Sequence, residues 1–344
     1  MYLVIIGIIG VGVAAVYFLY RKRHNIIPKK KGSDPGALWS TKNGKELLKF
    51  RTEPWNVYDQ WLDSPGNMYK EMDKPVVDPY KERCPNGYTR FVCVADTDTG
   101  KMDMDQMAKA FKALPWGHVL IHTGNFSRAG HVTVLAKFNQ ALGQLKHEHK
   151  IVIAGNHEIS LDKYPHTKLF TGQPIKQFHA YRPEENPGSP ANAKAILTNC
   201  TFLEDSEVKV RGFRIYGSPW HPITEQFGAF TAHRGEAILK KWKKIPDGID
   251  ILMTPGAPFG HGDGVQFYGT NVTYHCGCMD LLSEVQTRVK PKIHVFGTCD
   301  KGVASSTDGV TYYFNSASDP EESADSTSFK YFVFDLPDRK VKLI

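Results

Sequence analysis

The run Ile151-Val152-Ile153-Ala154-Gly155-Asn156-His157-Glu158 decides the fold of this 344-residue chain. Its first four residues are apolar and predict a buried strand, and the polar tetrapeptide after them predicts a loop at the carboxyl end of that strand. In α/β sheets, ligands gather where the carboxyl ends of strands meet loops. The stretch therefore predicts an α/β protein with a polar site at residues 155–158.

Apolar strands and amphipathic helices alternate on both sides of this run, which argues for a layered α/β domain. The expected strands cover residues 88–95, 118–122, 150–154, 213–216, 249–253, 292–296, 311–315 and 331–334. The expected helices cover residues 103–114, 132–145, 232–242 and 279–289. Polar residues or glycine follow five of the strands, at Asp96, Asn125, Asn156, Thr254 and Gly297.

With these strand ends, the chain resembles the calcineurin-like metallophosphoesterases, and in particular their metallophosphoesterase-domain-containing subgroup. The similarity covers residues 88–337 and is strongest at residues 89–93, 122–124, 150–158, 212–217 and 248–254. The resemblance implies a layered β-sandwich flanked by helices. It also implies two divalent metals about 3.5–4 Å apart, which clamp a phosphate and activate water. Asn156 would bind a metal, and His157 would face the phosphate.

Several metal ligands of that family are replaced in this chain. The family's Asp-x-His is Asp96-Thr97-Asp98 here, and the metal-bridging Asp of its Gly-Asp motif is Asn125. Its Thr-His-Gly-Pro-Pro has Pro255 in place of the histidine, and its Gly-His-x-His reads Gly297-Thr298-Cys299-Asp300. Of the ligands that the resemblance implies, only Asp96 and Asn156 keep their identity.

The loss of the bridging carboxylate has the largest expected consequence. Two divalent ions at the family spacing repel each other by roughly 18 kcal/mol at an effective dielectric of about 20. A shared carboxylate offsets much of this repulsion, whereas the neutral Asn125 compensates no charge. Because Pro255 also has no donor side chain, we expect the second metal not to bind.

The first metal position leaves two readings open. Asp96, Asp98 and Asp300, with Asn125 nearby, offer hard oxygen ligands that suit a single Mg²⁺ or Mn²⁺ ion. In the other reading these acids are solvated loop residues. His157 is likewise either the phosphate-facing acid or a packed loop residue, and Glu158 is expected to brace the loop. His122 and His294 lie in strands, where packing is expected rather than metal binding.

The N-terminus predicts a single membrane anchor. Residues 1–20 carry no charged side chain, and twenty apolar residues in a helix span a bilayer core of roughly 30 Å. A cleaved signal peptide is the alternative, although it would have a basic start and a shorter apolar region. Six cations at residues 21–31 favour a cytoplasmic position for the rest of the chain. The expected organisation is an anchor at 1–20, a basic Pro-rich linker at 21–86 and a globular domain at 87–340.

The net charge and the set of retained metal ligands are compatible with three functions. The formal net charge of +7 falls to +1 when the six cations of the linker are subtracted, so no extended nucleic-acid surface is expected. The first hypothesis is a membrane-anchored pseudoenzyme that binds a nucleotide, another phosphoester or a protein partner. The second is an active phosphodiesterase with an altered or single-metal site. The third is a structural tether that uses the fold as an interaction surface.

Overall fold

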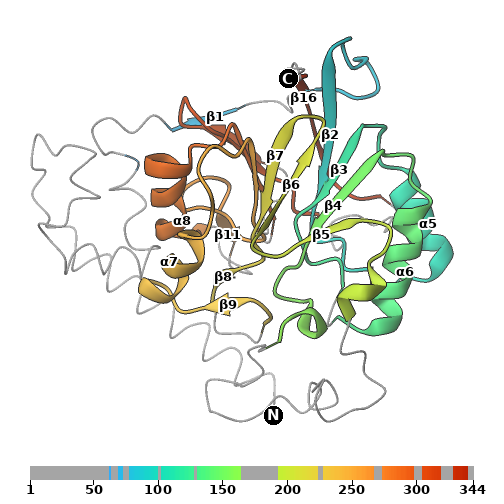
Figure 1. Cartoon of the computed structure of the whole chain (residues 1–344), viewed down its shortest axis with the longest axis horizontal. Coiled ribbons are helices and arrows are strands. Elements are labelled where there is room, and N and C mark those ends of the chain that lie inside the picture. Colours follow the sequence, from blue (N-terminus) through green and yellow to red (C-terminus); the bar gives the residue numbers. More distant parts are fainter. Residues whose placement is uncertain are drawn as a thin grey trace, which may run out of the picture.

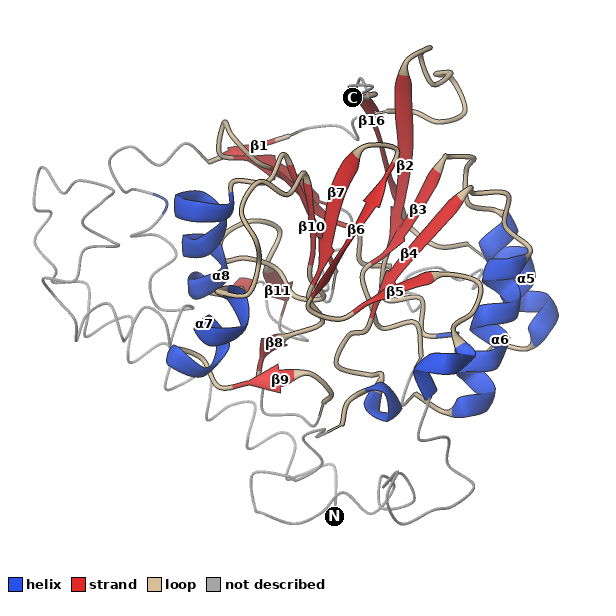
Figure 2. Cartoon of the chain, viewed as in Figure 1, coloured by secondary structure: helices blue, strands red, loops and turns tan. Residues whose placement is uncertain are grey.

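Two β-sheets packed face to face form the centre of the molecule in the computed structural model (Figures 1 and 2). The structure describes residues 62, 69–72, 77–99, 102–127, 130–163, 193–223, 228–266, 273–297, 304–318 and 328–339. The five-stranded sheet has the order β16 (Phe332–Pro337), β2 (Tyr88–Val94), β3 (Val119–His122), β4 (His149–Ile153) and β5 (Thr201–Leu203). Strands β2 to β5 run parallel, and β16 is antiparallel to β2.

The seven-stranded sheet is mixed. Its order is β1 (Lys70–Glu71), β14 (Ala304–Thr307), β15 (Tyr312–Asn315), β13 (Ile293–Phe296), β10 (Ile251–Met253), β7 (Phe213–Gly217) and β6 (Ser206–Val210). The central strands β15, β13, β10 and β7 are parallel, and β14 and β6 pair antiparallel with their neighbours. Strand β1, from the segment before the globular domain, pairs antiparallel with β14 at one edge.

Helices cover the outer face of each sheet, which gives four layers (Figure 2). Helices α5 (Met104–Lys112) and α6 (Val132–Gly143) cover the five-stranded sheet, while α7 (Glu236–Trp242) and α8 (Met279–Glu284) cover the seven-stranded sheet. A π-helical turn, Val285–Val289, continues α8. Short 3₁₀ turns lie at Ile159–Leu161 and Ala193–Ile196. Two small two-stranded sheets pair β8 (His221–Pro222) with β9 (Thr231–Ala232) and β11 (Gly264–Gln266) with β12 (Thr273–His275).

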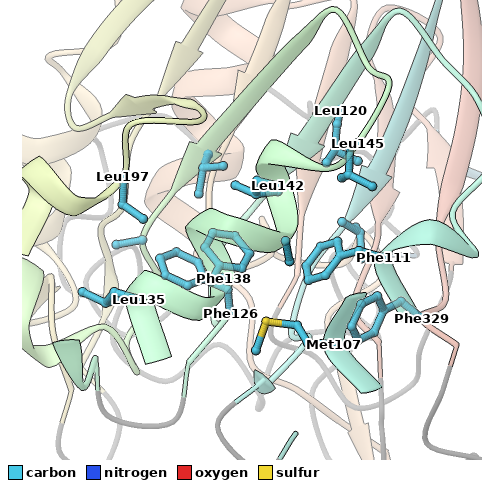
Figure 3. Close-up of a cluster of buried hydrophobic side chains, with 14 of the residues drawn as sticks. Met107, Phe111, Leu120, Phe126, Leu135, Phe138, Leu142, Leu145, Leu197 and Phe329 are labelled. Atoms are coloured by element: carbon cyan, nitrogen blue, oxygen red, sulfur yellow. The ribbon is translucent and has the colours of Figure 1, made fainter. Parts of the chain in front are cut away.

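Alternation along β4 shows why the parallel strands are apolar on both faces. Ile151 and Ile153 pack between the two sheets, whereas Val152 faces the helices. Strand side chains point to opposite faces in turn, so a strand covered on both sides needs apolar residues throughout. Figure 3 shows the helix-side cluster, in which Phe111 of α5 and Phe138 of α6 pack in the layer between the helices and this sheet. The resulting α/β sandwich confirms the expected layers.

The observed start of α5 agrees with the sequence prediction, because its N-cap residue can be recognised in the sequence. The observed start of α7 differs, because the residues before it pair with another strand. Asp103 caps α5 in a reciprocal capping box with Gln106, as a helix start at residue 103 requires. The helix expected from residue 232 begins instead at Glu236, and that expectation was wrong at its start. Thr231 and Ala232 pair with β8, and Gly235 has a φ of 87°, so the chain cannot yet be helical there.

The expectations for the N-terminus lie mostly outside the described residues. Among the residues that the structure does describe, no helix is long and apolar enough to cross a bilayer. Residues 1–20 are not among them.

Candidate functional site

The carboxyl ends of β2, β3 and β4 bring three of the sequence-predicted residues together. Asp96, Asn125 and Asn156 follow these adjacent parallel strands of the five-stranded sheet, which Figure 1 labels. The backbone ladder extends into the loops, where the Asp96 N–H donates to the Gly124 carbonyl at 3.0 Å. The Asp98 N–H donates to the Asn125 carbonyl at 3.2 Å. The first two loops are therefore held in register past the strands.

These loops have an unusual backbone conformation. Asp96, Asp98 and Asn125 have φ values of 52°, 31° and 55°. A left-handed conformation is uncommon for residues other than glycine, and Asp and Asn tolerate it best. Such conformations cluster at functional sites, where the surrounding structure has to impose them. Three candidate site residues therefore share a backbone state that the sequence motif did not indicate.

The Asn125 side chain joins the two family ligands that the chain retains. Its Nδ2 donates to Asp96 Oδ1 at 2.9 Å and to Asn156 Oδ1 at 3.1 Å. Its Oδ1 accepts a hydrogen bond from the His157 backbone N–H at 3.2 Å. Because a backbone N–H can only donate, this last bond fixes which end of the amide is oxygen. Two hydrogens of an amide therefore face Asp96 and Asn156, at the position to which the resemblance assigns a bridging carboxylate.

Glu158 braces the loops that carry this amide, as the sequence predicted. Its carboxylate is fully buried and accepts hydrogen bonds from the backbone N–H groups of Asn125, Ser127 and Gly155 at 2.7–2.9 Å. The Ser127 hydroxyl adds a fourth bond at 2.9 Å. Burial raises the pKa of Glu158 to about 7, and these four donors act against that rise. A single side chain thus fixes the loops after β3 and β4.

Close backbone approach requires glycine at two of the loops. A Cβ on Gly155 would lie 2.8 Å from the Asn125 backbone nitrogen and closer still to its side-chain oxygen. A Cβ on Gly297, at the end of β13, would lie 2.6 Å from Asp96 Oδ2. Both glycines therefore let neighbouring loops touch the polar network, and Gly297 brings the seven-stranded sheet against Asp96.

The described loops of the seven-stranded sheet contribute few side chains that could coordinate a metal near Asp96 and Asn156. Pro255 follows β10, and its carbonyl accepts from the Gly297 N–H at 2.9 Å. The Thr254 hydroxyl donates to the Gly256 carbonyl at 2.8 Å and contacts His294 Nε2 at 2.8 Å. Asp300, the remaining sequence-predicted ligand, lies outside the described residues. The side chain at position 255 thus has no atom that could coordinate a metal.

The two strand histidines are packed residues, as expected. His122 is fully buried, contacts Thr97 Oγ1 through Nε2 at 3.1 Å, and accepts the Gly124 N–H at Nδ1. Burial lowers the pKa of His122 and of His294 to about 3 in each case. Both imidazoles are therefore neutral at physiological pH. In each of them Nε2 is hydrogen-bonded to a threonine hydroxyl at the end of a strand.

Sequence reasoning missed one histidine that lies beside the site. His221 starts β8, and its backbone N–H donates to the Phe230 carbonyl at 3.0 Å. The neighbouring Ala229 N–H donates to the Asn156 carbonyl at 2.8 Å, so the segment before β9 is bonded to the loop of the central motif. The His221 side chain is buried, and burial lowers its pKa to about 4. Its position four residues after the end of β7 was the available signal, because strand ends form the site.

A cavity of about 590 Å³ lies at the opposite end of the strands. It is lined by residues that include Tyr88 at the start of β2, His118 before β3, and Arg211 between β6 and β7. The carboxyl ends of those parallel strands are on the other side of the molecule. This cavity is therefore separate from the polar network.

The donor groups of the described residues do not fit the family's two-metal centre. Within the described ranges, no three or more His, Cys, Asp or Glu side chains are grouped so that they could hold a metal ion. Asn125 offers two hydrogens to Asp96 and Asn156, and its oxygen already accepts from His157. An amide in this arrangement cannot bridge two cations without breaking those bonds.

Comparison with known proteins identifies the family to which the chain is similar. The family model of the calcineurin-like phosphoesterases matches residues 89–297. Human metallophosphoesterase domain-containing protein 1 is 45% identical over 278 residues, which cover 79% of each chain. A UPF0046 protein of Caenorhabditis elegans is 36% identical over 248 residues, covering 72% of this chain and 81% of that one. The solved phosphopantetheinyl hydrolase of Mycobacterium tuberculosis aligns with 75% of this chain and 99% of its own at 11% identity and a TM-score of 0.43.

Proposed function

The chain belongs to the calcineurin-like phosphoesterase family, and to its metallophosphoesterase-domain-containing subgroup, and from this premise we propose a phosphoester-binding protein with impaired hydrolysis. The observation that carries the proposal is the Asn125 amide, which donates to both Asp96 and Asn156. Hydrolysis by two metals needs an anionic bridge at this point, because the bridge offsets the repulsion between the cations. A neutral amide locked by hydrogen bonds removes that bridge.

The retained residues support binding of a phosphoester. His157 keeps its place beside Asn156 in the loop after β4, and Glu158 holds that loop through hydrogen bonds to the Asn125 and Gly155 N–H groups. We propose a nucleotide or another phosphoester as the ligand and, on the carboxylate side, at most one hard divalent ion such as Mg²⁺ or Mn²⁺. Asp96 and Asp98 would hold that ion together with Asp300, which lies outside the described residues.

Hydrolysis of bis-p-nitrophenyl phosphate by the full-length protein with added Mn²⁺ tests the proposal. We expect turnover close to that of the metal solution alone. The combined variant Asp98→His, Asn125→Asp, Pro255→His and Asp300→His restores four of the replaced family ligands and leaves Thr298 unchanged. It is expected to raise turnover by about 100-fold or more, the scale lost when one electrostatic group is removed from a catalytic site.

Two outcomes of this assay would overturn the proposal or narrow it. Robust metal-dependent turnover by the natural chain, abolished by Asp96→Ala, would establish instead an active phosphodiesterase with an altered or single-metal site. One feature favours that alternative: the backbone of His221, whose imidazole is buried, is linked through Phe230 and Ala229 to the Asn156 carbonyl. No gain in a folded combined variant would mean that further parts of the pocket have changed.

We also propose that residues 1–20 anchor the protein in a membrane with the globular domain on the cytoplasmic side. The uncharged run followed by six cations supports this orientation. Extraction of cell membranes with alkaline carbonate should leave the full-length protein in the pellet, and external protease should not reach the domain in intact cells. Release by carbonate, or cleavage of the domain from outside, would contradict the anchor or its orientation.

A further inference from the structure

Strand β1 places part of the predicted linker on the seven-stranded sheet. Residues 69–72, called the linker strap below, lie within the linker that the sequence predicts at 21–86. Strand β1 of this strap pairs antiparallel with β14 at the edge of the sheet, where Figure 2 labels it. The Met72 N–H donates to the Ser305 carbonyl at 3.0 Å, and the Ser305 hydroxyl donates to the Met72 carbonyl at 3.3 Å. Strand β14 therefore takes its outer partner from the linker.

The Tyr69 side chain of the strap contacts a buried histidine on one face of this sheet. Glu71 is the register partner of Ser306, and Ser306 is the register partner of Tyr313 on β15. Side chains two positions apart along an extended chain point to the same face, so Tyr69 shares the face of Ser306. The ring centroid of His261 lies 5.2 Å from that of Tyr69 and 3.7 Å from that of Tyr313. His261 Nδ1 also lies 2.8 Å from Ser306 Oγ, so one imidazole contacts the strap, β14 and β15.

His261 belongs to the loop after β10, residues 254–263, which also borders the candidate site. At the start of this loop, the Pro255 carbonyl accepts a hydrogen bond from the Gly297 N–H at 2.9 Å. Gly297 lies against Asp96, since a Cβ added to this glycine would be 2.6 Å from Asp96 Oδ2. The loop therefore contacts the surroundings of Asp96 near its start and the linker strap near its end.

The strap is less firmly held than the histidine that it contacts. Strand β1 is two residues long, and both of them, Lys70 and Glu71, are exposed. Segments that bury little apolar surface open at a lower free energy than the core of a domain. His261 and Tyr313, by contrast, are fully buried. Undocking of the strap therefore removes an aromatic neighbour from a buried imidazole without unfolding of the domain.

We propose that the linker strap is a conformational device that controls the loop after β10. When the strap is docked on β14, the ring of Tyr69 holds His261 in place and the loop is ordered. When the strap undocks, the loop becomes mobile, and with it one border of the candidate site. The position of the linker thus sets the mobility of that border. This inference goes beyond the proposed function, because it concerns the motion of the loop and not the ligand or its hydrolysis.

Hydrogen exchange of the full-length protein, followed at individual backbone amides, tests the device. Met72→Pro is the first variant, because it removes the N–H that bonds the Ser305 carbonyl and leaves the Tyr69 ring unchanged. We expect exchange to become about 3- to 10-fold faster at residues 305–307 and also in the loop, the scale of one lost hydrogen bond. The Phe259 N–H reports on the loop, since it donates to the Cys278 carbonyl at 3.2 Å.

Variants of Tyr69 test whether its ring transmits the effect. Tyr69→Ala should make exchange of the Phe259 amide about 2- to 10-fold faster, the scale of one aromatic contact, whereas Tyr69→Phe keeps the ring and should stay within about twofold of the natural chain. Tyr80→Ala is the matched control and should leave the Phe259 amide unchanged. Tyr80 also lies in the predicted linker, but its hydroxyl bonds the Ala113 carbonyl at 3.4 Å, on the five-stranded side.

The pattern of exchange decides the outcome. Faster exchange at residues 305–307 of Met72→Pro with an unchanged Phe259 amide would overturn the proposal, because the strap would then be a local edge contact. Equal acceleration in Tyr80→Ala, or in strands β2 to β4 of any variant, would also overturn it, since the loosening would be general. Turnover bears only on the impaired hydrolysis and exchange only on the strap, so failure of one proposal is distinguishable from failure of the other.

Discussion

At the candidate site, the loops of the five-stranded sheet are joined by side-chain hydrogen bonds, whereas those of the seven-stranded sheet meet mainly through backbone. On the first side, Asn125 and Glu158 take part in at least seven hydrogen bonds among the described residues. On the second side, the Gly297 N–H bonds the Pro255 carbonyl, and the Thr254 N–H bonds the Val295 carbonyl.

This difference explains which parts of the family motif the chain keeps. Gly155 and Glu158 are needed to build the loops even when no metal is bound, because one allows close approach and the other satisfies buried donors. At position 255 the backbone carbonyl accepts the Gly297 N–H, a bond that proline can make as well as histidine can. An intact central motif is therefore evidence for the fold and a weaker indicator of hydrolysis.

The largest expected effect is a loss of stability at low pH, which comes from one buried histidine in each sheet. His122 and His294 each bond a strand-end threonine and have a pKa of about 3, compared with 6.5 for an ordinary histidine. The unfolded chain therefore binds more protons than the folded chain between pH 6.5 and 3, so stability falls as the pH is lowered through that range. At 1.36 kcal/mol per pH unit, each histidine accounts for roughly 4–5 kcal/mol by pH 3.

Measurement of the unfolding free energy against pH checks this expectation. Glu158 acts in the opposite direction, since its raised pKa lowers stability as the pH rises from 4.5 to about 7. The variants His122→Gln and His294→Gln should each reduce the slope below pH 6 by similar amounts. If only one variant reduced the slope of unfolding free energy against pH, the buried histidine of the other sheet would not contribute to the loss of stability.

Removal of the Glu158 carboxylate tests whether the loops of the five-stranded sheet depend on side-chain hydrogen bonds. Glu158→Ala leaves three backbone N–H groups and one hydroxyl without their acceptor in a buried place. Breaking such a network is expected to lower the unfolding free energy by about 3–5 kcal/mol. Urea denaturation at pH 8, where the carboxyl is ionised, gives the value. A loss below about 1 kcal/mol would mean that water replaces the carboxylate and that the loops do not depend on it.

Asn125→Asp should have an intermediate effect that metal reverses. A carboxylate oxygen would face Asp96 Oδ1 and Asn156 Oδ1, where the amide now donates, and the unfolding free energy should fall by about 1–3 kcal/mol. Mn²⁺ should raise the melting temperature of this variant more than that of the natural chain. Asn139→Asp is the matched control, because its amide also donates and accepts but lies away from the site. Equal metal responses in both variants would contradict the prediction.

Thr254→Val should have the smallest effect of the set. The change removes the hydroxyl contact to His294 and the bond to the Gly256 carbonyl, while the backbone bonds between the β10 and β13 loops remain. We expect a loss of about 1–2 kcal/mol in thermal unfolding. A loss as large as that of Glu158→Ala would remove the contrast between the sheets.

Most of the central fold was predictable because its strands are apolar and its helices have amphipathic spacing, and α5 also has a readable cap. The apolar run of β4 and the capping box at Asp103 are local signals that packing does not override. Short strands such as β8 and β9 were not predictable, since two residues carry no periodicity and the pairing joins positions ten residues apart. The helix start near residue 232 was misplaced for the same reason.

The sequence by itself determined the layers, the order of the strands with polar ends, and the identity of the missing family ligands. Those features depend on residue type and on the local spacing of apolar residues, and both can be read directly from the sequence. Only the tertiary structure decided that the Asn125 amide donates to Asp96 and Asn156, and that the segment between β8 and β9 bonds the Asn156 carbonyl. Both outcomes depend on distances between residues far apart in the chain, and such distances are set by how the two sheets and their loops pack together.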